Sequence, residues 1–129
     1  GFIEHPVLDT KRYVNIADYV KRGSVPEGVM SPIALAATLE RDSATAMKLV
    51  ADVRARGGVS PTLDCELTDI EAWCAYGRYF AEKLRGGVAL ATARAMGDAA
   101  QQRTAVAALE RALAHWNRLA ELAARFNQR

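Results

Sequence analysis

The residue types that usually perform catalysis are few in this chain, and their spacing forms no recognisable active site. Two of the 129 residues are histidines. His5 precedes the first predicted helix, and His115 has no Glu three residues before it. The Glu-x-x-His pattern by which helical bundles hold two iron ions is therefore missing. No nucleophile elbow and no phosphate loop after a strand is found either. We expect this chain alone to be non-catalytic, with no cofactor-binding and no metal-binding residues.

The two cysteines, Cys65 and Cys74, have no spacing typical of a metal site or a redox motif. Cys65 lies in a predicted loop and Cys74 in the second turn of a predicted helix. They can form one disulfide or remain two separate thiols. The sequence favours separate thiols with Cys74 partly buried, because small domains held together by disulfides carry more cysteines.

The best-organised charged feature is a stripe at helical spacing, in which Arg78 and Glu82 are four residues apart and can pair. It comprises Glu71, Arg78, Glu82 and Arg85. The opposite side of the same predicted helix is apolar and comprises Ile70, Trp73, Gly77, Ala81, Leu84, Val88 and Ala91. Because the helical period points the charged stripe away from the apolar side, we expect a solvated, salt-bridged face and no acid/base catalysis. Tyr79, at the edge of this helix, is our candidate for an aromatic surface role such as stacking on sugar rings.

The last predicted helix carries two apolar stripes side by side. The predicted core seam comprises Ala105, Val106, Leu109, Leu113, Trp116, Ala120 and Ala123. The second stripe comprises His115, Leu119, Leu122 and Phe126. This second stripe is either part of a wide core face, covered by the N-terminal segment, or a docking surface for another domain or a second copy.

Start and stop signals divide the chain into an extended lead-in and one helical domain. Asn15 and Ser31-Pro32 are typical helix starts, Thr68 to Glu71 form a capping box, and Asp98 can cap the last helix. Gly23, Gly57-Gly58 and Gly97 are stops. The lead-in is 1–14 and the domain is 15–129, with helices at about 15–22, 31–56, 68–96 and 98–128.

These elements predict an all-α fold, an up-down bundle of three long helices with a short N-terminal helix across one end or packed as a fourth member. Gly77, Gly86 and Gly87 fall inside the third helix, which indicates close approach of a neighbouring backbone or of a large side chain such as Trp116, or a kink at Gly86-Gly87.

A net charge of +2, with basic residues spread among acidic ones, argues against nucleic-acid binding. No apolar run is long enough to cross a membrane, and no signal peptide is found. Because the chain opens on Gly1 without an initiator Met, we expect a piece of a longer protein.

One stretch, Leu67 to Trp116, resembles a helical region near the C-terminal end of large secreted bacterial polysaccharide-degrading proteins of the α-glucuronidase-like glycoside hydrolase kind. The elements that carry the resemblance are Asp69-Ile70-Glu71-Ala72, the run from Gly77 to Gly86 (GRYFAEKLRG), Gly97-Asp98 and Leu113-Ala114-His115-Trp116. The segment Ile16 to Val20 (IADYV) fits the same pattern.

The resemblance implies a non-catalytic accessory domain that packs on or spaces a catalytic domain elsewhere in a carbohydrate-active, secreted or periplasmic protein. In such proteins the catalytic carboxylates lie on a barrel, and this chain has no βαβ alternation from which a barrel could form. No catalytic residue is therefore carried over. Docking would use the Leu119/Leu122/Phe126 stripe or the Tyr79 side. The alternatives are a stand-alone interaction or oligomerisation module and a glycan-binding helical module.

Overall fold

The computed structural model describes residues 1–5, 7 and 9–127, with the side chains of Phe126 and Asn127 also left out of the description. These residues form four helices: α1 (Ile16–Arg22), α2 (Pro32–Ala55), α3 (Pro61–Met96) and α4 (Ala99–Asn127). No strand occurs in the described ranges, where the only sheet-like pairing is an isolated bridge between Tyr13 and Met30. The all-α prediction is confirmed.

The helix ends follow local side-chain chemistry. Asn15, Ser31 and Asp98 each accept hydrogen bonds from backbone N–H groups of the following turn, at 2.8, 3.0 and 2.9 Å for the shortest bond of each. Gly23 and Gly97 end α1 and α3 with φ of 72° and 64°, in the left-handed region that glycine adopts without strain. Because these signals are contained in a few adjacent residues, the sequence predicted them correctly.

The start of α3 was predicted wrongly. The helix begins at Pro61, and Ser60 is its N-cap, with Oγ 3.1 Å from the backbone N of Leu63. Residues 61–67 are therefore helical and not a loop, and Cys65 lies on a helix. Thr68 is inside the helix, fully buried, and its hydroxyl donates to the carbonyl of Asp64 at 2.8 Å, so it caps nothing. Ser60-Pro61 repeats the start signal of Ser31-Pro32, but it lies so close to Gly57-Gly58 that the whole stretch resembled a loop.

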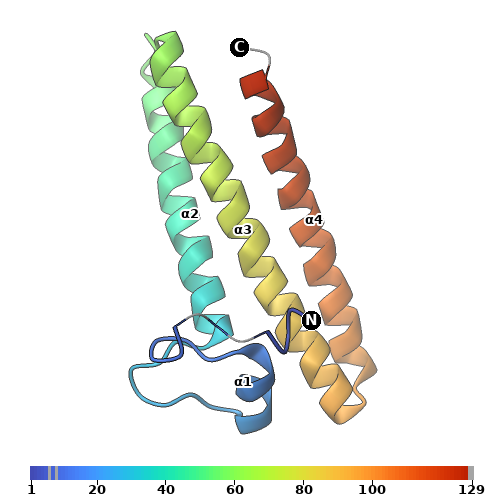
Figure 1. Ribbon diagram of the computed structural model, residues 1–129. Helices are drawn as coiled ribbons and strands as arrows, with labels where there is room; N and C mark the ends of the chain where they lie inside the picture. The colour runs from blue at the N-terminus through green and yellow to red at the C-terminus, as the bar shows by residue number, and fades with distance from the viewer. Residues whose placement is uncertain (6, 8, 128–129) are drawn as a thin grey trace.

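Helix α3 is the central element. Among the described residues it packs on α1, α2 and α4, and it takes part in every extensive helix–helix contact. Figure 1 shows α2, α3 and α4 side by side with α3 in the middle, and with α1 at the end of the molecule where α3 leads into α4. This packing is consistent with an up-down order of the three long helices.

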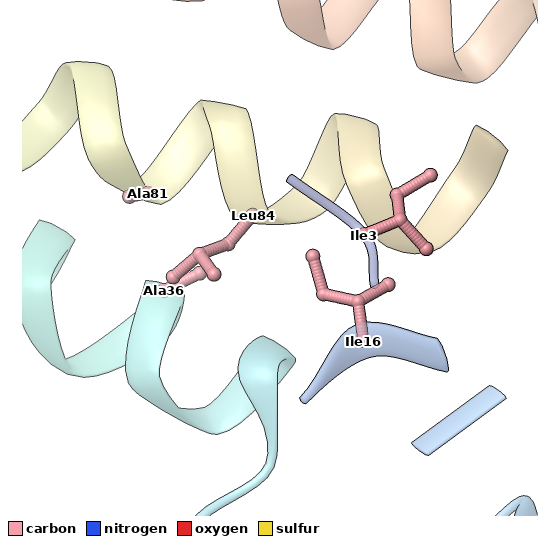
Figure 2. Packing of buried hydrophobic residues seen from close by; sticks show 5 residues of the cluster. All are labelled: Ile3, Ile16, Ala36, Ala81 and Leu84. Atoms are coloured by element: carbon pink, nitrogen blue, oxygen red, sulfur yellow. The ribbon is translucent and has the colours of Figure 1, made fainter. Parts of the chain in front are cut away.

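A cluster of buried apolar side chains lies at the α1 end. Ile3 of the lead-in and Ile16 of α1 approach α3 from one side, and Ala36 of α2 approaches it from another (Figure 2). Their partners on α3 are Ala81 and Leu84. The lead-in is thus packed into the core through Ile3, and it covers the C-terminal half of α3.

The remaining contacts between the long helices use mainly small side chains. The buried apolar residues of α3 and α4 are largely alanines: Ala75, Ala81, Ala89, Ala93, Ala105, Ala108 and Ala112. An ideal Cβ built on Gly86 would lie 3.0 Å from Cδ2 of Leu109, and one on Gly87 would lie 2.7 Å from Cδ1 of Ile16. The expected close approach at the helical glycines is therefore present. The large neighbours are Leu109 and Ile16, and α3 continues as one helix through both glycines.

Candidate functional site

Two faces of α3 carry the side chains that the sequence singled out. We call the first the charged groove. It comprises Glu71, Arg78, Glu82 and Arg85 of α3, together with Glu40 and Arg54 of α2 and Arg111 and Arg118 of α4. We call the second the aromatic face; it comprises Trp73, Tyr76 and Tyr79 of α3 with Leu109, Leu113 and Trp116 of α4. Glu71 and Trp73 lie on opposite sides of the helix because two residues turn it by about 200°.

One end of the charged groove is centred on Glu71, whose side chain is only 8% exposed. Its Oε1 accepts from Arg54 of α2, with Nη2 at 2.8 Å and Nε at 2.9 Å. Its Oε2 lies 3.5 Å from Nη2 of Arg118 on α4. Arg54 also donates to Asp64 at 2.8 Å, and the hydrogen bonds to Asp64 and then to Glu71 raise the pKa of its guanidinium. One carboxylate therefore joins all three long helices.

The other end of the groove repeats this arrangement through Glu82. Its Oε1 lies 3.3 Å from Nη1 of Arg85, and that same Nη1 lies 2.5 Å from Oε2 of Glu40 on α2. Its Oε2 accepts from Nε of Arg111 on α4 at 3.0 Å. The second cluster thus also runs from α2 through α3 to α4.

The expectation of a solvated face is wrong for Glu71, which is buried, and Glu82 is nearly so at 12% side-chain exposure. The expected pair between Arg78 and Glu82 is replaced by the pairs that Glu82 makes with Arg85 and Arg111. Since arginines engage these carboxylates, the groove holds the helices in register and offers no obvious general base. Sequence reasoning missed Arg54, Arg111, Arg118 and Glu40, because recognising them requires the alignment of three helices.

The aromatic face is a chain of ring contacts. The ring centroids of Trp73 and Tyr76 are 6.2 Å apart, those of Tyr76 and Tyr79 are 6.1 Å apart, and those of Tyr79 and Trp116 are 5.1 Å apart. The Lys83 ammonium lies 5.6 Å from the Tyr79 ring centroid and 4.8 Å from that of Phe2 in the lead-in. Tyr79 is half-buried, whereas Trp73, Tyr76 and Trp116 in the same chain of ring contacts are exposed.

The exposed apolar side chains on these two helices are large. Trp73 is 73% exposed, Leu113 is 59% exposed, and Ile70, Tyr76, Val106, Leu109 and Trp116 are also exposed. The sequence had placed Ile70, Trp73, Val106, Leu109, Leu113 and Trp116 in the core, and that placement is wrong. The interfaces of α3 with its neighbours use alanines and glycines, so the largest side chains remain outside.

The second stripe of α4 has the opposite outcome. Leu122 is 1% exposed, so it belongs to the interior of the monomer, while Leu119 and His115 are half-buried. The side chain of Phe126 lies outside the described residues. Leu122 is therefore a core residue, as the first alternative predicted. A buried side chain is not accessible to a partner, so Leu122 is not part of a docking surface. The large apolar side chains of α4 that are exposed, namely Val106, Leu109, Leu113 and Trp116, are ones that the sequence had assigned to the core.

Cys65 and Cys74 are not joined by a disulfide, and burial raises the pKa of the Cys74 thiol. Within the described ranges, no group of His, Cys, Asp and Glu side chains is placed to hold a metal ion. None of the helices described is both long and apolar enough to cross a bilayer.

A cavity of about 450 Å³ lies under the lead-in at the α1 end. Its lining is mainly apolar and includes Phe2, Ile16, Leu35, Phe80 and Leu84. A smaller cavity of about 240 Å³ opens into the charged groove between its two ion-pair clusters. It is lined by Glu40, Ala44, Arg78, Ala81, Glu82 and His115.

Comparison with known proteins finds no matching protein family, no matching curated protein and no matching solved structure.

Proposed function

We propose that this chain is a non-catalytic accessory domain of a larger, glycoside hydrolase-like protein, and that it acts by docking on another domain of that protein through the aromatic face. In this proposal the three long helices form an up-down bundle that serves as a rigid spacer. The carbohydrate-active context rests on the resemblance of the stretch from Leu67 to Trp116.

The observation that supports docking is the concentration of large apolar side chains on the Tyr79 side of α3 and α4. Trp73, Leu113 and Trp116 are all exposed there, although the buried apolar residues of α3 and α4 are largely alanines. Trp and Tyr are enriched where proteins bind partners, since they bury much area for little loss of side-chain entropy. An extensive exposed apolar surface is typical of an interaction site.

The docking proposal predicts that Leu113→Asp in the full-length protein releases this domain from its neighbour. A charge placed in a buried apolar interface lowers affinity strongly, by about tenfold or more. Loss of docking would appear as a larger radius of gyration in small-angle X-ray scattering.

The matched control is Leu49→Asp. Leu49 is 61% exposed on α2, close to the 59% of Leu113, but lies outside the aromatic face. Circular dichroism of both variants of the isolated chain should show an unchanged helical fold. Equal radii of gyration for the native protein and both variants would exclude docking through this face.

Glycan binding is the second candidate, because the ring contacts from Trp73 to Trp116 place several aromatic side chains along one exposed surface. The two tryptophans of the chain both belong to this face and report on it directly. Titration with acidic xylan fragments should change tryptophan fluorescence if sugars stack there, and an unchanged spectrum would reject this candidate.

The alternative of self-association through the same face has its own test. Light scattering on the isolated chain distinguishes a monomer, which supports the accessory domain, from a stable dimer, which supports a stand-alone oligomerisation module.

A further inference from the structure

Arg78 differs from the other arginines of the charged groove. Arg54, Arg85, Arg111 and Arg118 each contact at least one carboxylate. Arg78 is half-buried and makes no ion pair with any residue that the structure describes. A partly desolvated guanidinium ordinarily has an anionic partner, because removing it from water is costly.

The position of Arg78 indicates where an anionic partner could bind. Arg78 lies along α3 between Glu71 and Glu82, the centres of the two ion-pair clusters. It lines the cavity of about 240 Å³, and His115 of α4 lines the same cavity. Two nitrogen-bearing side chains from different helices therefore border one small space.

The acidic groups around this cavity are already engaged. Glu82 contacts Arg85 and Arg111, and Glu40 contacts Arg85. In this cluster the two carboxylates and two guanidinium groups balance, so Arg78 adds one positive charge beside the cavity. The Glu40 side chain is 54% exposed and stands at the rim, where it can turn towards solvent.

We propose that the cavity between Arg78 and His115 is a binding site for a small carboxylate. The planar fork of a guanidinium matches the two oxygens of a carboxylate, and such charge-assisted bonds are stronger than neutral ones. The one positive charge that Arg78 adds to this cluster suits a monoanion, and the cavity of about 240 Å³ is smaller than the roughly 300–1,000 Å³ typical of drug-sized ligands. The imidazole of His115 supplies a second polar contact from α4.

The test uses the two histidine rings of the chain as reporters. Sodium acetate and sodium lactate are titrated into the protein at constant ionic strength, with sodium chloride as the blank and sodium phosphate as a second arm. Ring carbon–proton correlations in NMR spectra should show a saturable shift for His115. His5 lies in the lead-in and outside this cavity, so it is the internal control.

Arg78→Gln should weaken binding by about tenfold or more, as expected for the loss of a bidentate charged contact. It leaves no carboxylate unpaired, so the fold should persist, and circular dichroism checks this. Arg103→Gln, at an exposed position of α4 outside the cavity, is the matched control. Glu40→Gln should strengthen binding a few-fold by removing a negative charge at the rim, a gain that a purely structural role would not produce.

Three results would overturn the proposal. The first is a His115 shift no larger than that in sodium chloride, which would mean that the cavity does not bind carboxylates in preference to chloride. The second is a response to phosphate without one to the carboxylates, which would reassign the ligand class. The third is an equal response in Arg78→Gln, which would place the anion elsewhere.

Discussion

The charged groove and the aromatic face lie on opposite sides of one helix and reverse the usual distribution of residue types. Glu71 is 8% exposed in its side chain, whereas Trp73, two residues later, is 73% exposed. The carboxylate is buried because arginines of α2 and α4 reach it from both sides. The indole is exposed because no described element covers that part of α3. Position relative to neighbouring helices, and not hydrophobicity alone, decides burial here.

The two halves of α3 differ in whether the lead-in and α1 cover their apolar side chains. At the C-terminal half of α3, Phe2 and Ile16 lie against Gly87, and Phe2 packs on Phe80 with a centroid distance of 6.1 Å. At the N-terminal half, Ile70, Trp73 and Tyr76 have no such cover and remain exposed. The lead-in and α1 thus bury one half of this side, and the other half is available to a partner.

The largest effect is expected at Leu122 of α4. Leu122→Asp should destabilise the fold by at least ~4 kcal/mol, because it removes a buried side chain and leaves an unpaired charge in the interior. Urea unfolding followed by circular dichroism measures this. Leu113→Asp, nine residues earlier on the same helix, should cost less than about 1 kcal/mol. Similar losses at the two positions would mean that the faces of α4 have been assigned wrongly.

Glu71→Ala should give the next largest effect, about 2 kcal/mol, because it leaves Arg54 and Arg118 without their shared carboxylate. The loss stays below that of a fully buried pair because both arginines are partly exposed and can be hydrated. Glu121→Ala, at an exposed residue that pairs with Arg118, should change the free energy of unfolding by less than about 0.5 kcal/mol. If Glu71→Ala and Glu121→Ala lowered the free energy of unfolding equally, the ion pairs of Glu71 would contribute no more than exposed surface pairs.

The smallest effects are expected on the aromatic face. Trp116→Ala should cost about 1 kcal/mol, since it removes the ring contact with Tyr79. Trp73→Ala, at the far end of the ring chain, should stay within about 0.5 kcal/mol. Thermal unfolding compares the two, and a larger loss at Trp73 would show that the uncovered half of α3 is buried by a contact within this chain.

The helix ends are the part of the structure that the local sequence predicts best. Asn15, Ser31, Asp98, Gly23 and Gly97 set helix ends as predicted, because each acts on backbone groups within one turn of itself. The start at Ser60-Pro61 was missed for a local reason too, since two glycines and a proline in close succession resemble a loop.

The helix faces could not be determined in the same way. Along α3, apolar residues occur on nearly every side, so the period identifies stripes without saying which of them meets a neighbour. The assumption that the largest apolar residues mark the core failed for Trp73 and Leu113. Alanine and glycine at Ala81, Gly86 and Ala105 let the helices approach closely, and a bulky side chain would not fit there.

The sequence by itself determined the helical content and most helix ends, because these depend on residues that are adjacent or one turn apart. Only the tertiary structure decided that Glu71 is buried, that Arg78 and His115 border one cavity, and that Trp73, Tyr76 and Trp116 are exposed. Each of these depends on how three helices align along their lengths, and that alignment arises from the sum of many weak contacts between residues far apart in the chain.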